Sequence, residues 1–243
     1  FIPYAPGDGG GSIGSALITA KKKNKNVNFT NLQTPFIGPK FSDLKIDTKI
    51  KNTNELSKFK VEYYKDKNIL YEKVAKLIFE NKIIGFFNDQ MEFGARALGN
   101  RSILANPCDT KIQDIINSKI KRREMFRPFA PSILSEKKNE WFGNSYPNPY
   151  MSAVEKINKN KRHLIPAVTH IDGTGRVQTV TKEINSDFYS LIEKFYQISN
   201  VPILLNTSFN ENEPIVMDPD HAINCFLRTE MDVLILNRYI ILR

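Results

Sequence analysis

Four polar clusters along the chain combine residue types that bind anions. Three of them carry arginines: Arg96 and Arg101 in NDQMEFGARALGNRS (88–102), Arg127 in KIKRREMFRPFAP (119–131), and Arg176 in THIDGTGRVQT (169–179). A guanidinium group offers a planar fork of N–H donors that matches a phosphate or a carboxylate. The glycines beside these arginines let the backbone approach a bound group closely or adopt a positive φ. The pattern therefore predicts an anion site.

Neutral and titratable side chains add to this predicted site. Asn206 and Ser208 lie in the fourth cluster, LLNTSFNENEPI (204–215), directly after an apolar run. There they could donate hydrogen bonds and orient a small planar group. His170 lies in the third cluster, although a histidine at a strand end is as often structural as catalytic.

The arginines have a catalytic interpretation and a structural one. A single arginine is most often one partner of a surface salt bridge. If Arg96, Arg127 and Arg176 converge on one cleft, however, they neutralise a polyphosphate and stabilise charge as a phosphoryl oxygen is attacked. We therefore predict these three as catalytic residues, with Arg101, His170, Asn206 and Ser208 as further binding residues.

Apolar periodicity predicts the elements that must position these clusters. Helices are expected over 13–20, 69–82, 111–121, 187–199 and 220–229, and strands over 83–87, 166–172, 175–180, 201–209 and 231–243. The clusters fall at the ends of predicted strands, where α/β sheets usually bind ligands. Helices that alternate with short apolar strands indicate an α/β or α+β domain from about residue 60 to residue 243.

Composition limits the setting and the partners. The net charge of +9 comes largely from lysines mixed with asparagine, as in KKKNKN (21–26), which is typical of a solvated loop. Nucleic-acid surfaces combine a basic stripe with stacking aromatics, so a nucleic-acid partner is not favoured. No apolar run reaches the roughly 18 residues of a membrane span. Two distant cysteines without metal-ligand spacing favour a reducing, cytoplasmic location.

Several catalytic motifs are missing from the sequence. It has no Walker A motif, no GxGxxG after a strand, no GxSxG, no HExxH and no CxxC pair. A serine hydrolase, a zincin and a Rossmann oxidoreductase are therefore disfavoured. The residues themselves indicate an enzyme that handles ATP or an acyl phosphate, without naming the acyl group.

The motifs do resemble those of one family. MEFGARALGNRSILANP, NSKIKRREMFRPFAPSIL, IPAVTHIDGTGRVQTV and PILLNTSFNENEPIV are similar, in order and spacing, to the C-terminal region of the nodulation and antibiotic O-carbamoyltransferases (NodU/CmcH type). The similarity covers roughly residues 69–243. The opening segment, YAPGDGGGSIGSAL, resembles the end of the family's N-terminal domain, which has an actin-like (ASKHA) fold.

This resemblance implies a domain organisation and a reaction. We expect residues 1–35 to be a remnant of the actin-like transferase domain, 36–68 a linker, and 69–243 a YrdC-like domain with a twisted mixed sheet and flanking helices. In the family, the YrdC-like domain makes carbamoyl-adenylate from carbamoyl phosphate and ATP with Mg²⁺. The actin-like domain then passes the carbamoyl group to a hydroxyl of a sugar-like or natural-product acceptor.

The resemblance also implies ligand contacts. The family's contacts to ATP and carbamoyl phosphate would fall on Arg96, Arg127, Arg176 and Asn206. Asp8 matches a carboxylate that, with two upstream histidines, holds Fe²⁺ or a similar divalent metal in the full-length protein. The family usually has proline where this chain has Ala95.

Two other functions remain open from the sequence. One is an RNA-binding module, because YrdC-like folds have a basic concave face. Base stacking needs exposed aromatics, whereas Phe93, Phe126 and Phe129 lie in apolar contexts that indicate packing. The other is an enzyme that makes threonylcarbamoyl-adenylate for tRNA. The actin-like tail and the RPFAP and THIDGTGR motifs argue against it.

Overall fold

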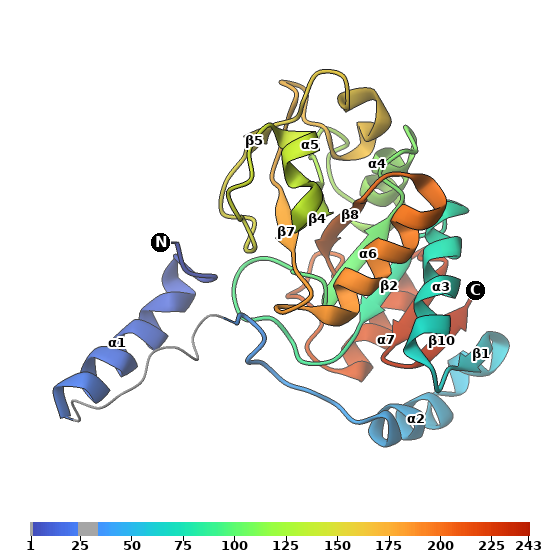
Figure 1. Ribbon diagram of the computed structural model, residues 1–243. Coiled ribbons are helices and arrows are strands. Elements are labelled where there is room, and N and C mark those ends of the chain that lie inside the picture. Colours follow the sequence, from blue (N-terminus) through green and yellow to red (C-terminus); the bar gives the residue numbers. More distant parts are fainter. Residues whose placement is uncertain (1, 24–33) are drawn as a thin grey trace.

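The fold is built on one mixed β-sheet. A computed structural model describes residues 2–23 and 34–243 (Figure 1). Eight strands form the main sheet in the order β1-β10-β9-β2-β3-β8-β4-β7. Their bounds are Lys60–Tyr63 (β1), Ile84–Phe87 (β2), Arg101–Ala105 (β3), Ala130–Leu134 (β4), Gln178–Val180 (β7), Ile203–Ser208 (β8), Val233–Leu236 (β9) and Tyr239–Leu242 (β10). Two short strands, β5 (Glu155–Lys156) and β6 (Thr174–Gly175), pair separately.

Helices cover both faces of this sheet. The α-helices are α1 (Asp8–Lys23), α2 (Asp43–Asn52), α3 (Lys67–Phe79), α4 (Ile112–Ile115), α5 (Lys138–Phe142), α6 (Ser186–Ser199) and α7 (Pro219–Arg228), and a π-helical turn, Ile116–Ile120, continues α4. Helices α3 and α6 pack against each other in front of the sheet in Figure 1, and α7 lies behind it against β2 and β9. Each of α3, α6 and α7 begins at an Asp or Asn side chain that accepts a backbone N–H, as expected at an N-cap.

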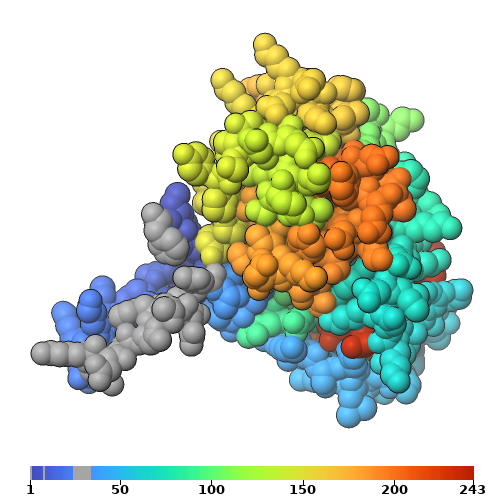
Figure 2. Space-filling view, in the orientation of Figure 1, coloured from blue at the N-terminus to red at the C-terminus, as the bar shows by residue number. Residues whose placement is uncertain are grey.

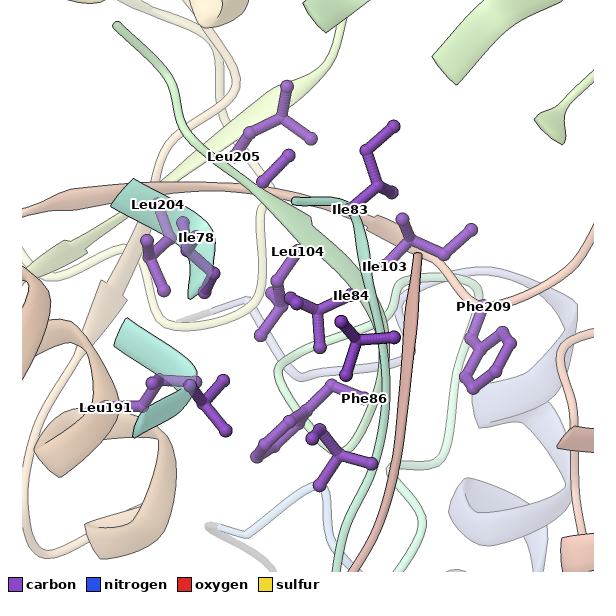
Figure 3. Packing of buried hydrophobic residues seen from close by; sticks show 14 of the residues in the cluster. Ile78, Ile83, Ile84, Phe86, Ile103, Leu104, Leu191, Leu204, Leu205 and Phe209 are labelled. Atoms are coloured by element: carbon purple, nitrogen blue, oxygen red, sulfur yellow. The ribbon is translucent and has the colours of Figure 1, made fainter. Parts of the chain in front are cut away.

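The core consists of apolar side chains from the central strands and the helices that cover them. Figure 3 shows strand residues such as Phe86 and Leu104 between Leu191 of α6 on one side and Phe209 on the other. All four of these side chains are fully buried. Strands buried on both faces are continuous apolar runs, which explains why IIGFF and VLIL lack polar alternation.

The pairing of four strands creates one functional edge of the sheet. Strand β8 runs antiparallel to β3 and β4, and β4 runs parallel to β7. The carboxyl end of β8 therefore lies beside the starts of β3, β4 and β7. All four polar clusters of the sequence meet at this edge, where β2 and β8 contribute carboxyl ends and β3, β4 and β7 contribute their starts.

The predicted elements agree with the structure for most helices and differ for some strands. The expected strand over 166–172 is a 3₁₀ helix, Pro166–Val168, followed by a turn. The single strand expected over 231–243 is a hairpin of β9 and β10, which reverses where Asn237 adopts a φ of +50°. Strands β3 and β4 were not predicted, because their short apolar runs follow directly on the arginine clusters.

The segments before the main sheet contribute elements of their own. Figures 1 and 2 show α1 standing away from the body of the molecule, and Ile18 on this helix is 59% exposed. Within the stretch expected as a linker, β1 joins the main sheet by pairing with β10. No helix in the described part of the chain is long and apolar enough to cross a membrane.

Candidate active site

A cavity of about 390 Å³ lies at the functional edge of the sheet. Its lining comprises Ala95, Arg96, Ala97, Arg123, Arg127, Pro128, Phe129, Ala130, Met151, His170, Arg176, Asn206, Thr207 and Ser208. Six of the seven site residues expected from the arginine, histidine and neutral clusters are in this set. The described lining contains four arginines and no carboxylate, so the cavity is strongly cationic.

Arg96 and Arg176 both line the cavity and lie close enough for their positive charges to repel each other. Neither side chain has a hydrogen-bond or ion-pair partner among the described residues. Partial burial lowers the pKa of Arg96, and the nearby positive charge of Arg176 lowers it further. Two adjacent guanidinium groups that repel each other are an unfavourable arrangement unless an anion binds between them. This pair therefore indicates a binding site for a multiply charged anion.

A second pair of arginines lines the cavity from the segment before β4. Arg127 forms an ion pair with Glu124 (2.9 Å) in which both side chains are half exposed. Arg123 donates to Asn117 (2.8 Å), and its guanidinium lies 5.0 Å from the centre of the Phe129 ring. Burial lowers the pKa of Arg123, and Arg127 adds to this effect. An anion in the cavity would relieve this repulsion as well.

Asn206 is fixed by a buried neutral network. Its Nδ2 donates to Ser132 Oγ (3.0 Å) and Gln178 Oε1 (3.0 Å), and contacts Ala97 O at 3.3 Å. Its Oδ1 is buried and has no hydrogen-bond partner in the described chain. An unpaired buried acceptor is costly, so an N–H donor from a ligand that reaches this atom would stabilise the site. An amide or carbamoyl group provides such a donor.

Ser208 is tied to a buried lysine that the sequence interpretation did not select. Lys121 Nζ donates to Ser208 O (2.5 Å), Asn210 Oδ1 (2.6 Å) and Asn210 O (2.9 Å), and is 3.2 Å from Ser208 Oγ. Burial lowers the pKa of Lys121 to about 7, with Arg123 acting in the same direction. Lys121 thus fixes the end of β8 through hydrogen bonds to Ser208 and Asn210.

His170 lines the cavity, and its neighbour Asp172 has a local role. Burial lowers the pKa of His170, partly offset by Asp172, so the imidazole is neutral at pH 7. Its Nδ1 lies 3.1 Å from Thr174 Oγ1. Asp172 lies in the same cluster as Arg176, but its carboxylate accepts from the N–H and the hydroxyl of Thr174. Asp172 therefore closes the turn at Gly173, where φ is +78°.

Arg101 is not part of this cavity. It is the first residue of β3 and is completely buried, with its guanidinium 3.6 Å from the centre of the Phe87 ring. Its two terminal nitrogens donate to backbone carbonyls of Asn88 (2.8 Å), Asn100 (3.0 Å), Pro39 (3.2 Å) and Asp89 (3.2 Å). With both terminal nitrogens bonded to backbone carbonyls, Arg101 stabilises the fold instead of contacting a ligand.

The glycines of the first cluster have the conformations that the sequence suggested. Gly94 has a φ of +125° and Gly99 a φ of +110°. Side chains are strained in this region, so glycine is required for the path of the loop. This path separates Arg96, which enters the cavity, from Arg101, which enters the core.

The expected metal ligand is not supported by a cluster in the described chain. Asp8 is the first residue of α1, and its side chain lies outside the described residues. Across residues 2–23 and 34–243, no three His, Cys, Asp or Glu side chains come together as a metal site. The described residues therefore do not test the expected metal site, and no chemical step is assigned to a metal ion.

Two residues were missed at the sequence level: Arg123, which lines the cavity, and Lys121, which holds the cavity residue Ser208. Arg123 lies in a run of three basic residues, where only the fold decides which side chain turns inward. Lys121 ends an isoleucine-rich helix. It lies four residues after Asn117, which is also buried, and this helical spacing was the available signal that both side chains share one face.

The strand order and helices define a known fold class. The structure is similar to full-length HypF, solved in a phosphate- and nucleotide-bound form, with a TM-score of 0.50 and 18% identity over 74% of this chain and 22% of HypF. The chain has the YrdC-like fold, with a mixed sheet and flanking helices.

Sequence comparison identifies the family. The family described as "Carbamoyltransferase C-terminus" matches residues 75–243. The nodulation protein NolNO of Sinorhizobium fredii is 38% identical over 99% of this chain and 35% of its own length. The nodulation protein NolO of Bradyrhizobium diazoefficiens is 34% identical over 99% of this chain and 44% of its own length. The chain belongs to the carbamoyltransferase family of enzymes.

A relative without an assigned role shows the same coverage. An uncharacterized protein of Synechocystis is 38% identical over 99% of this chain and 43% of its own length. The chain therefore spans less than half the length of these curated relatives.

Proposed function

We propose that this chain carries the activating half of an ATP-dependent carbamoyltransferase, and that its cavity forms carbamoyl-adenylate from carbamoyl phosphate and ATP. One observation carries this proposal: Arg96 and Arg176 lie together, unpaired, in a cavity whose described lining has no carboxylate. Membership of the carbamoyltransferase family supports carbamoyl transfer as the chemistry.

The proposed reaction balances with one water molecule. Water cleaves carbamoyl phosphate to carbamate and inorganic phosphate. A carbamate oxygen then attacks the α-phosphorus of ATP, and the bond to the bridging oxygen breaks to release pyrophosphate. Negative charge builds up on the attacked phosphoryl group, where fixed guanidinium groups are most effective. ATP arrives with its own Mg²⁺, which serves as part of the substrate.

Each residue has a role in this proposal. Arg96 and Arg176 hold the phosphate of carbamoyl phosphate and later the pyrophosphate. Arg123 and Arg127, which line the cavity from the segment before β4, neutralise the phosphate chain of ATP. The unpaired Oδ1 of Asn206 accepts an N–H of the carbamoyl group, which distinguishes it from an acetyl group of similar size.

Direct binding and pyrophosphate release test this function. Calorimetry should show binding of carbamoyl phosphate and of ATP with Mg²⁺, and the two together should release pyrophosphate. Arg96→Ala and Arg127→Ala should each lose about 2–4 kcal/mol of transition-state stabilisation, as for one preorganised donor. Arg122→Ala is the matched control, because Arg122 pairs with Glu211 (3.0 Å) and does not line the cavity. A folded protein that binds neither ligand would refute the proposal.

The acceptor step is expected to need more than this chain. Transfer to a hydroxyl would use the part of the longer relatives that this chain does not match. We therefore expect pyrophosphate release without carbamoylated product when the chain is assayed with a sugar-like acceptor. Formation of carbamoylated product by the chain alone would contradict this division of the reaction.

A further inference from the structure

The loop that carries Arg96 is closed by one buried carboxylate. Glu92 stands at its start and is 3% exposed. Its Oε1 accepts hydrogen bonds from the backbone N–H groups of Leu98 (2.6 Å), Asn100 (3.2 Å) and Arg101 (3.2 Å). A single oxygen atom thus fastens the end of the loop to its beginning.

The position of the Arg96 guanidinium depends on this backbone. The side chain has no hydrogen-bond or ion-pair partner among the described residues, so only the path of the loop directs it into the cavity. That path passes through positive φ values at Gly94 and Gly99. Such a backbone is intrinsically flexible, because glycine is allowed in many other conformations. Fixing it requires strong interactions at the base of the loop.

The negative charge of Glu92 suits this task better than a neutral acceptor. Hydrogen bonds from backbone N–H groups to a carboxylate are shorter and about twice as strong as those to a neutral oxygen. The charge is also compensated, since Glu92 lies near the buried guanidinium of Arg101 and raises its pKa against the effect of burial. Two further ties to the loop are neutral: Gln178 donates to Leu98 O (2.9 Å), and Gly99 N donates to Ser102 Oγ (3.0 Å).

We propose that Glu92 is a positioning residue of this active site, which fixes the loop so that Arg96 is preorganised for the phosphate of carbamoyl phosphate. The inference rests on the proposed function, because it takes carbamoyl phosphate as the ligand of Arg96. Glu92 does not line the cavity, so it acts through Arg96 and not by contact with the substrate.

A double-mutant cycle tests this role with the full 243-residue chain. Carbamoyl phosphate affinity is measured by calorimetry for wild type, Glu92→Gln, Arg96→Ala and the double variant. Glu92→Gln keeps the side-chain shape and should weaken binding by about tenfold, the effect of weakening charge-assisted hydrogen bonds. In the Arg96→Ala background the same change should have an effect of less than about twofold, because interacting residues are not additive. The exposed Glu80→Gln removes a carboxylate elsewhere and should bind like wild type.

The outcomes separate this inference from the proposed function. If wild type does not bind carbamoyl phosphate, the proposed function fails. If wild type binds and Arg96→Ala binds more weakly, but Glu92→Gln binds normally or weakens both backgrounds equally, the positioning role is overturned and the function stands. If Glu92→Gln does not fold, Ser102→Ala replaces it, since it removes only the acceptor for Gly99 N. That variant should show a smaller loss, again only when Arg96 is present, and normal binding would overturn the inference.

Discussion

Arg176 allows the anion site to be tested by opposite effects on function and stability. We expect Arg176→Ala to lose pyrophosphate release while the folded state is as stable as wild type or more so. Most buried or half-buried charges stabilise the fold through a partner, and removing such a charge destabilises it. Arg176 is half-buried, has no partner in the described chain and lies near the positive charge of Arg96. Its loss therefore removes a repulsion and no attraction.

The expected magnitudes follow from these contacts. Loss of one preorganised donor costs about 2–4 kcal/mol of transition-state stabilisation, or about 30- to 1,000-fold in rate. Relief of a solvent-screened repulsion is worth about 0–1 kcal/mol, which corresponds to a rise in Tm of up to about 3 °C for a chain of this size. Arg176→Lys should lose nearly as much activity as Arg176→Ala, because an ammonium group cannot form the bidentate contact.

Two assays on the same preparations decide the matter. Pyrophosphate release in the presence of carbamoyl phosphate reports function, and thermal unfolding without ligand reports stability. Near-normal activity of Arg176→Lys would show that the residue is not a bidentate ligand contact. A fall of more than about 1 kcal/mol in the unfolding free energy of Arg176→Ala would show that Arg176 has a structural partner, and the argument from an unpaired cation would fail.

Three further predictions come from the buried charges. Arg101→Ala should lower the free energy of unfolding by about 3–5 kcal/mol in urea denaturation, because it removes four buried hydrogen bonds to backbone carbonyls and the packing of the guanidinium against Phe87; a loss below about 1 kcal/mol would argue against its structural role. The pKa of Lys121 is depressed from 10.5 to about 7, so between these values the unfolded state binds more protons and stability should rise with pH. Relative to Lys121→Met, wild type should gain about 2 kcal/mol from pH 7.5 to pH 9.5, and parallel profiles would contradict this pKa. The pKa of His170 is lowered from its ordinary value of 6.5, and protonation of its imidazole adds a positive charge near Arg176. The affinity for carbamoyl phosphate should therefore rise more between pH 7 and pH 5 in wild type than in His170→Gln. Equal rises in the two proteins would exclude His170 from the site.

The sequence was sufficient to select most of the polar residues that line the cavity. Glycine-flanked arginines, a histidine and neutral donors after an apolar strand predicted an anion site, and six of the seven residues expected for it line one cavity. These inferences hold because charge, hydrogen-bonding capacity and backbone freedom are properties of the residue types themselves. The long helices were predicted for a similar reason, since their apolar periodicity extends over several turns.

The structure was needed to separate residues with similar local sequences. Arg96 and Arg101 lie five residues apart, and both follow a glycine, yet one enters the cavity and the other fills the core beside Phe87. The different positions of the two side chains depend on where β3 begins and on which backbone carbonyls surround the Arg101 guanidinium. One of these carbonyls belongs to Pro39, which is far away in the sequence. Neither property can be read from neighbouring residues.

The same reason explains the residues that were missed. Lys121 is buried because the end of β8 supplies oxygen atoms for its ammonium group, and Glu92 is buried because the loop it closes folds back over it. A charged residue is normally expected at the surface, and its burial becomes favourable only when partners arrive from elsewhere in the chain. The sequence thus determined which groups are available for carbamoyl-transfer chemistry. Only the tertiary structure decided which of them meet, because that depends on strand pairing between segments as distant as β3 and β8.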